Sequence, residues 1–393
     1  MAGGSTERPS HGATETAFAL RLRAWGGLLT AAALLLALTN VLFGLLFRRD
    51  PSSTADFLQV VAWSGEWLRG LNPYAPPHSD ADYPPNALVA LSPLATIAAG
   101  SAIALWTALH VMLTAVIGVM ASRLVSFGRW ALLFAALVVS LPPFRTVMQF
   151  SIASFAPALA GFLLADRYPR LAGAAIGISL IKPQIGGPFL LWAIAARRWK
   201  TVGMAIAVPA ALFALYLVRA LRAPQHVVRE WLEAIGRGHN HPDLTGGEIN
   251  LQPLLAWISM PPLGIQMLIA TVLALGLLII WQRRQDDFDL RFLAAACLLS
   301  LLSVRHLSYD LLLAIPALAF VWSRDGRGAR LLAAGAFAVL IVSPPSLYRH
   351  YFEPRFITTP ADALLVHAYR IVAMALFAFT LLSTSSRRRF DTI

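Results

Sequence analysis

The chain has 393 residues, of which 58% are hydrophobic and only 13% are charged. A soluble domain needs more charge than this to keep its surface hydrated, so the composition indicates a protein embedded in a lipid bilayer. The net charge of +12 does not indicate a nucleic-acid partner, because the arginines stand mostly at the ends of apolar runs, as the positive-inside rule predicts.

The apolar runs predict an all-α polytopic membrane protein, because a backbone exposed to lipid must satisfy its hydrogen bonds internally. We expect a bundle of about 11–12 transmembrane helices, each of about 20 residues. The predicted spans, in chain order, are 24–47, 87–122, 129–143, 149–165, 170–181, 185–196, 201–221, 262–282, 290–304, 308–322, 331–346 and 364–383. Several are too short to cross upright. The break around Lys182 indicates a broken or re-entrant element, and the long span 87–122 can begin with a half-helix.

Basic residues mark one side of this predicted bundle. They stand before the first span, after the last span and in every second connection: Arg21, Arg23, Arg123, Arg129, Arg167, Arg170, Arg197, Arg198, Lys200, Arg283, Arg284, Arg324, Arg327, Arg330, Arg387, Arg388 and Arg389. Short loops this rich in arginine belong in the cytoplasm, so both termini are expected there. We interpret residues 1–23 as a disordered cytosolic tail, 24–383 as one transmembrane domain and 384–393 as a basic cytosolic tail.

Three long connections, 48–86, 222–261 and 347–363, then fall on the external side. A compact membrane bundle has no structural need for loops of this length, so we expect them to carry function. The sequence shows no internal repeat of fixed period, which weakens a transporter interpretation, because many transporters are built from repeated halves.

The first external loop is predicted to contain an amphipathic helix that starts at Ser53 or Thr54 and ends near Arg69, before Gly70. Its apolar and aromatic side chains suit the membrane–water interface: Phe57, Val60, Val61, Trp63, Trp67 and Leu68. Asp56 stands in the first turn of this helix. On the residues alone, its carboxylate can simply stabilise the helix N-terminus.

Several short motifs follow one another along the chain. They are Asp56-Phe57, Gly70-Leu71-Asn72-Pro73-Tyr74, Tyr83-Pro84-Pro85, Ser92-Pro93-Leu94 with Trp106, Lys182-Pro183-Gln184, Arg197-Arg198-Trp199 and the segment 303–310. In this order they resemble the family 87 glycosyltransferases, membrane enzymes of the GT-C class related to mycobacterial polyprenyl-phosphate-mannose-dependent mannosyltransferases. The resemblance implies a GT-C-type bundle that transfers a hexose, mannose in those relatives, from a polyprenyl-phosphate donor to a lipid or glycan acceptor. It implies the external face of a bacterial-type plasma membrane, membrane lipids as surroundings, and no cofactor.

In such enzymes an aspartate near the start of the first external loop is the general base. By position this residue is Asp56, with Asp50 as the alternative. The base takes the proton of the acceptor hydroxyl as that oxygen attacks the sugar. Asp80 and Asp82, in the same loop, are interpreted as solvated acids.

The departing phosphate needs cations near the external helix ends. Lys182 interrupts an apolar stretch, and an intramembrane lysine is a functional candidate, although its ammonium could instead snorkel to the interface. Arg305 and His306 follow a predicted span and can both bind phosphate. An Arg305–Asp310 ion pair with a hydrogen-bonded His306 explains them equally well. Arg145 is a further phosphate candidate.

The sugar and the acceptor need polar and aromatic contacts, for which the candidates are Gln184, Tyr83, Asn72, Tyr309 and Asp310. A metal site is not expected. The loop with His239, His241 and Asp243 has no evident fourth ligand, and the single Cys297 excludes a cysteine-rich site.

Two other classes stay open on the sequence. A transporter or flippase of lipid-linked sugars would line a path through the middle of the membrane with polar residues, whereas the candidates above gather toward one face. A non-catalytic membrane scaffold would leave Asp56 replaceable.

Overall fold

The computed structural model describes residues 11–47, 51–75, 81–125, 129–145, 148–239, 249, 251, 262–304, 306–342 and 367–383. The regular elements within these ranges are all helical. In chain order they are α1 (His11–Phe47), α2 (Pro51–Leu68), α3 (Pro85–Leu91), η1 (Ser92–Thr96), α4 (Ala99–Ser122), α5 (Arg129–Val139), η2 (Pro142–Arg145), α6 (Ser151–Leu164), α7 (Pro169–Ser179), α8 (Pro183–Ala195), α9 (Trp199–Ala220), α10 (Pro224–His239), α11 (Pro262–Gln282), α12 (Phe288–Ser303), η4 (Ser308–Ala314), α13 (Ile315–Trp322), α14 (Arg327–Val342) and α17 (Ala368–Leu382).

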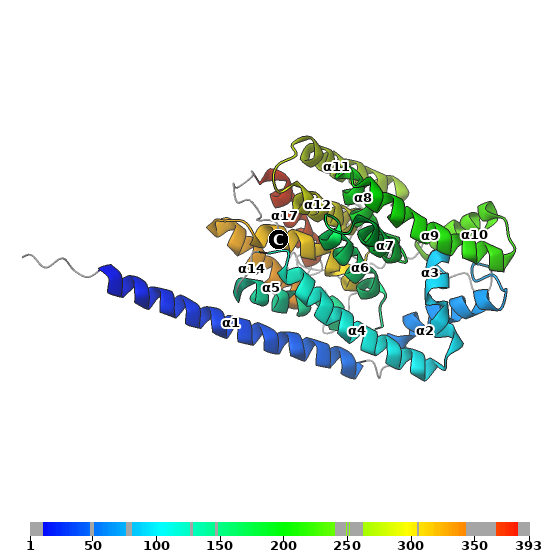
Figure 1. Cartoon of the computed structure of the whole chain (residues 1–393), viewed down its shortest axis with the longest axis horizontal. Helices are drawn as coiled ribbons and strands as arrows, with labels where there is room; N and C mark the ends of the chain where they lie inside the picture. The colour runs from blue at the N-terminus through cyan, green and yellow to red at the C-terminus, as the bar shows by residue number, and fades with distance from the viewer. Residues whose placement is uncertain are drawn as a thin grey trace, which may run out of the picture.

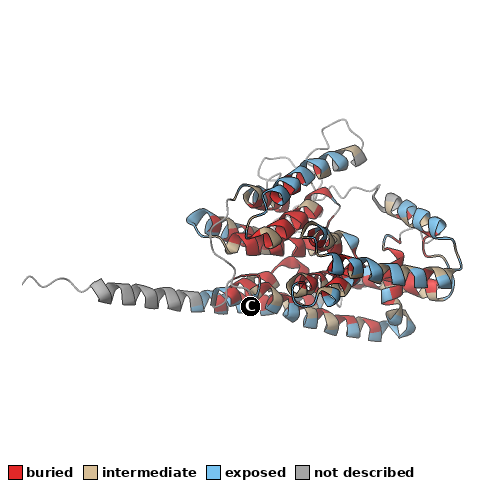
Figure 2. Cartoon of the chain, turned by 45° about the horizontal axis from the view of Figure 1, so that its top comes forward, coloured by how far each residue is buried: buried red, intermediate tan, exposed pale blue. Residues whose placement is uncertain are grey.

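Three of the described helices are long and apolar enough to cross a membrane, namely Gly27–Leu46 within α1, Ala99–Ser122 and Trp199–Ala220. Shorter apolar helices accompany them, among them α6 and α17. Figure 2 shows buried residues gathered in the centre of the bundle and exposed residues along the outward faces of peripheral helices. Many of the exposed side chains are large and hydrophobic, such as Leu35 and Val119, which suits contact with lipid. The all-α membrane class is therefore confirmed, and the count of about 11–12 crossings stays a prediction.

Several helix boundaries differ from the sequence prediction. One of them is the start of α2 at Pro51 and not at Ser53 or Thr54, which leaves Asp56 outside the first turn. The first helix begins at His11, so residues 11–23, which we predicted to lie in a disordered tail, extend α1. No proline interrupts this stretch and Gly12 is its last glycine before Gly26, so helix propagation meets no obstacle. The predicted span 87–122 is divided into α3, η1 and α4, because Pro93 at the start of η1 removes a helical hydrogen-bond donor.

The arginine-rich connections meet at one end of the bundle, which we call the arginine end (165–168, 196–198, 283–287 and 323–326). Arg198 donates to Asp166 at 2.5 Å and to Asp289 at 3.1 Å, and Arg324 pairs with Asp287. These contacts join the connections after α6, α8, α11 and α13. Because the helices between them run back and forth, the connections before α6, before α8 and after α9 lie at the opposite end.

The opposite end is assembled from segments that are far apart in the sequence. Asn86 donates a 3.1 Å hydrogen bond to the Leu180 carbonyl, and the backbone N–H of Ile249 donates to the His306 carbonyl at 2.9 Å. Figure 1 shows α2, α3 and α10 together at this end, away from the beginning of α1. The described parts of the predicted external loops 48–86 and 222–261 therefore lie side by side, while the loop 347–363 lies outside the described residues.

The tryptophans of α2 pack inside the protein. Trp63 and Trp67 are both buried. The Trp67 indole stacks on Tyr216 of α9 with a centroid separation of 5.7 Å, and its N–H donates to the Tyr216 carbonyl at 3.2 Å. We predicted these rings at the membrane–water interface. For Trp67, covering by α9 explains the difference, because an amphipathic pattern indicates which face is buried but not whether lipid or protein covers it.

Glycines allow α7 to approach its neighbours closely. A Cβ on Gly177 would lie 2.7 Å from the Cβ of Val208 and 3.1 Å from the Ala205 carbonyl oxygen, both on α9. Gly173, one turn earlier, faces the backbone of Thr201. Small residues four apart let helices in a membrane pack with their backbones in contact. The position of α8, and with it Lys182, depends on this packing because α8 follows α7 directly.

Gly177→Ala is expected to lower the free energy of unfolding by about 1–3 kcal/mol, because a packed interface cannot absorb an added methyl group. Thermal unfolding in detergent measures the loss. The unfolding is monitored by the reaction of a thiol-reactive dye with Cys297, which is the single cysteine of the chain and is buried in the fold. Gly203→Ala is the matched control on α9, where an added Cβ meets nothing within 4 Å. Equal melting of the two variants would contradict the close approach.

Candidate active site

Asp56 lies on α2 with its carboxylate exposed. Its neighbour Phe57 is fully buried and packs on Trp106 and Phe150, with centroid separations of 5.3 Å and 5.8 Å. The Gln149 amide donates a 2.7 Å hydrogen bond from Nε2 to Asp56 Oδ2. Phe57 thus fixes this turn of α2 to the bundle, and Gln149 fixes the direction of the Asp56 carboxylate.

A second group of polar side chains is buried inside the helical bundle. Lys182 Nζ lies 2.6 Å from Asp310 Oδ1 and donates to Ser151 Oγ at 2.8 Å. The Ser151 hydroxyl in turn donates to Asp310 Oδ1 at 2.6 Å. His306 Nδ1 lies 2.9 Å from Asp310 Oδ2, and its Nε2 lies 3.0 Å from the Ser300 hydroxyl. We call these five residues the buried polar cluster.

The buried polar cluster joins four elements at their ends. Ser151 begins α6, Lys182 directly precedes α8, Ser300 stands in the last turn of α12, and Asp310 lies in η4. A buried charge is costly unless it is paired and hydrogen-bonded. Here each carboxylate oxygen of Asp310 has a partner, which meets that requirement.

Tyr83 packs against Phe150, the residue between Gln149 and Ser151. Burial raises the pKa of the Tyr83 phenol well above its usual value, and the nearby groups Asp82, Tyr309, Asp310 and Asp56 raise it further. The Tyr83 ring packs edge-on against Phe150 at 5.4 Å. A neutral phenol in this position can donate a hydrogen bond to a substrate oxygen.

The other candidates from the sequence belong to the buried polar cluster, lie apart from it, or fall outside the described residues. Lys182, His306 and Asp310 meet in the buried polar cluster, and the Tyr309 ring centroid lies 4.5 Å from Lys182 Nζ. Gln184 contributes its backbone carbonyl, which accepts a 2.8 Å hydrogen bond from Ser300, while its half-buried side chain adjoins the cluster in sequence.

Asn72 and Arg145 lie apart from the cluster. The Asn72 amide donates to Glu230 at 3.0 Å, and Glu230 also accepts two 2.7 Å hydrogen bonds from Arg222, so Asn72 belongs to the contact with α10. Arg145 ends η2, which packs against η4, and its guanidinium is half-buried. Asp50, Arg305 and the segment 240–248, which holds His241 and Asp243, lie outside the described residues.

Three residues of this site were not identified from the sequence: Gln149, Ser151 and Ser300. The segment Gln149-Phe150-Ser151 does carry a signal, because two polar residues flank a phenylalanine where an apolar span is predicted to begin. Ser300 carries none, since a serine inside an apolar helix usually bonds its own backbone.

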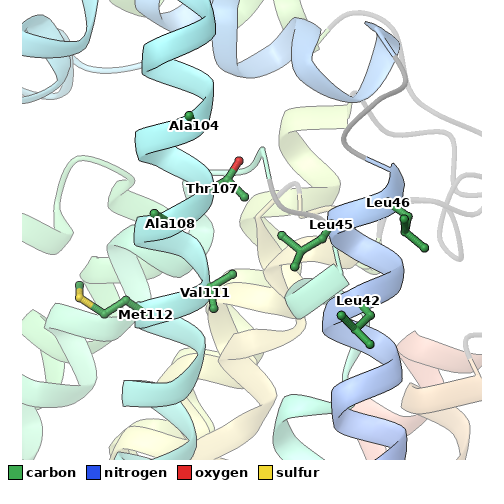
Figure 3. A pocket seen from close by; sticks show the side chains of 8 residues that line it. All are labelled: Leu42, Leu45, Leu46, Ala104, Thr107, Ala108, Val111 and Met112. Carbon is green, nitrogen blue, oxygen red and sulfur yellow. The ribbon is translucent and has the colours of Figure 1, made fainter.

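An apolar groove lies between α1 and α4. It has a volume of about 820 Å³ and is lined by Leu42, Leu45, Leu46, Ala104, Thr107, Ala108, Val111 and Met112. Figure 3 shows the α1 and α4 side chains on its two walls, with α2 crossing the upper end. On α4, Trp106 and His110 line a smaller hollow together with Gln149. Gln149 and the groove thus border neighbouring residues of α4, Trp106 and Thr107.

A model of the family described as glycosyltransferase family 87 matches residues 82–304, more than half of the chain. The match includes Tyr83, Gln149, Ser151, Lys182 and Ser300. No curated protein and no solved structure matches the chain.

Asp310→Asn is expected to destabilise the protein by about 3–5 kcal/mol, because it leaves the Lys182 ammonium buried without a counter-charge. Thermal unfolding in detergent measures the effect, and the double variant Lys182→Met/Asp310→Leu should recover much of the loss. Glu233→Gln provides the control, since its partner Arg229 and Glu233 itself are exposed and such pairs contribute little. A wild-type melting temperature for Asp310→Asn would contradict a stabilising ion pair.

Proposed function

The chain belongs to glycosyltransferase family 87, and we propose that it transfers a hexose from a polyprenyl-phosphate donor to a lipid or glycan acceptor. It is a membrane glycosyltransferase by family and composition. The proposal adds the donor class, mannose as the first sugar to test, and the membrane face opposite the arginine end. One observation supports it most strongly: an exposed carboxylate, Asp56, accepts a hydrogen bond from Gln149, which stands two residues before Ser151 of the buried polar cluster.

Asp56 is proposed as the general base. An inverting transfer needs a group that takes the proton of the acceptor hydroxyl while that oxygen bonds to the anomeric carbon. The bond from the anomeric carbon to the phosphate oxygen breaks in the same step, and the polyprenyl phosphate leaves with the bonding electrons. An exposed carboxylate can reach an acceptor from outside the bundle, whereas Asp310 is buried and already paired with Lys182.

The departing phosphate needs hydrogen-bond donors and positive charge. Lys182 and His306 are the proposed donors. Asp310 neutralises Lys182, so the net positive charge is proposed to come from Arg305, which directly precedes His306 in the sequence, and from Arg145 on the adjoining η2. Tyr83, Tyr309 and Gln184 are proposed sugar contacts, with Tyr83 donating from its protonated phenol. Asn72 is expected to act through its contact with Glu230, and Asp310 through its ion pair with Lys182.

The groove between α1 and α4 supports a donor with an isoprenoid tail. Its lining is aliphatic apart from Met112 and Thr107, whose hydroxyl donates to the Ile103 carbonyl at 2.7 Å, and none of the lining side chains carries a charge that could hold a nucleotide diphosphate. A tail in this groove stays at hydrocarbon depth, and its phosphate would emerge toward α2, the helix that carries Asp56 (Figure 3). Burial of a lipid tail contributes about 0.8 kcal/mol per CH₂ group.

Asp56→Asn is expected to reduce transfer at least about 100-fold, because general-base catalysis contributes a factor of about 10²–10⁴. The measurement is the transfer of radiolabelled mannose from polyprenyl-phosphate mannose to membrane acceptors. Asp82→Asn is the matched control, an exposed acid of the same connection, and should keep activity near that of wild type. Full activity of Asp56→Asn removes Asp56 from the mechanism.

Ala108→Phe is expected to raise the donor KM several-fold, because the added ring fills the groove that we assign to the tail. The effect should disappear with a donor whose isoprenoid tail is too short to reach Ala108. Ala115→Phe is the control, since this residue is exposed on the same helix and is absent from the groove lining. An equal KM change for long and short donors would contradict this placement of the tail.

A further inference from the structure

The amide of Gln149 is the partner that holds the Asp56 carboxylate. Nε2 donates to Oδ2 at 2.7 Å, and no other described residue makes a hydrogen bond to this side chain. We propose that Gln149 is a positioning residue for transfer: it holds Oδ2, so that Oδ1 faces the acceptor hydroxyl. This inference rests on the proposed role of Asp56 as the base.

Gln149 can act in this way because it is itself fixed. Its side chain is buried, with 9% of the residue exposed. The next residue, Phe150, packs on Phe57 and on Trp106 at a centroid separation of 4.6 Å. Ser151 then bonds Lys182 and Asp310. Three consecutive residues thus contact the base, the aromatic side chains beneath it and the buried polar cluster.

The side chain of an exposed aspartate on a helix can adopt several rotamers, but only some of them direct the carboxylate toward the acceptor. Each carboxylate orientation that points away from the acceptor lowers the fraction of productive complexes, and a misplacement of about 1 Å can reduce a rate about 100-fold. The Gln149 amide N–H is a hydrogen-bond donor only, so it cannot take up the proton of the acceptor hydroxyl. Gln149 therefore acts through Asp56 and takes no part in the proton transfer itself.

The first test is Gln149→Leu, which keeps the side-chain volume and removes the donor. We expect kcat to fall about 10–100-fold, with the donor KM within about twofold of wild type, because Gln149 acts on the chemical step and does not hold the donor. Asn40→Leu is the matched control. Asn40 is a buried amide on α1 that donates to the carbonyls of Val139 and Leu141 at 2.9 Å and 3.0 Å, so its loss should lower the melting temperature and leave kcat unchanged.

The second test separates positioning from a general structural role. Asp56→Glu moves the carboxylate by one methylene group, away from the position that Gln149 holds. In this background Gln149→Leu should cost less than about twofold, since residues that act as a unit are non-additive. The same fold-loss in both backgrounds would overturn the inference.

The outcomes also separate this inference from the proposed base. An active Asp56→Asn enzyme overturns the base and the positioning role together. An inactive Asp56→Asn enzyme with a Gln149→Leu variant at wild-type kcat overturns the positioning role alone. Loss of kcat in both single variants, with no further loss in the Asp56→Glu background, supports both.

Discussion

The ion pair between Lys182 and Asp310 determines how the helices meet at the end opposite the arginine end. Both side chains are buried, and removing two charges from water is repaid only when their geometry and hydrogen bonds are good. The partners come from the break between α7 and α8 and from η4, 128 residues apart in the sequence. If either partner moves, a charge is left unpaired, so the ion pair fixes the relative position of these elements.

The candidate site depends on that fixed arrangement through a short segment. Ser151 joins the ion pair directly, and Gln149, two residues earlier, reaches Asp56. A displacement of α6 would therefore change both the orientation of the Asp56 carboxylate and the hydrogen bonding of Lys182. This geometry explains how an exposed group on α2 can be held in register with a cluster that water does not reach. It also explains why Phe150 packs among Phe57, Tyr83 and Trp106, since the segment needs a rigid support.

The sequence predicted individual residues of this site better than their pairings. Apolar runs give the helices, because crossing lipid imposes length and composition, and Pro183 gives the break before α8 because proline suits a first helical turn. Lys182, His306 and Asp310 were identified as candidates, and Asp310 was weighed as a partner of Arg305, which lies outside the described residues. The pairing of Asp310 with Lys182 was not predicted. Asp56 and Gln149 are 93 residues apart, and no local pattern encodes a contact over that distance. The burial of Trp67 escaped prediction for the same reason, since α9 covers it.

The distribution of charge along the bundle bears on the choice between transfer and transport. Among the described residues, the buried charged side chains stand near one end or the other: Glu66, Lys182, Asp310 and Arg370 at the end of the candidate site, and Asp287 and Arg291 at the arginine end. A transporter of a lipid-linked sugar has to offer polar groups at the middle of the membrane, where its substrate headgroup must pass. A transferase needs them only where donor phosphate and acceptor hydroxyl meet. The charges at the arginine end are matched by neighbouring acids and backbone carbonyls, so they are accounted for as structural contacts. What then distinguishes the other end is an exposed carboxylate on α2, the helix that follows one wall of the apolar groove, an arrangement that serves a reaction at one face.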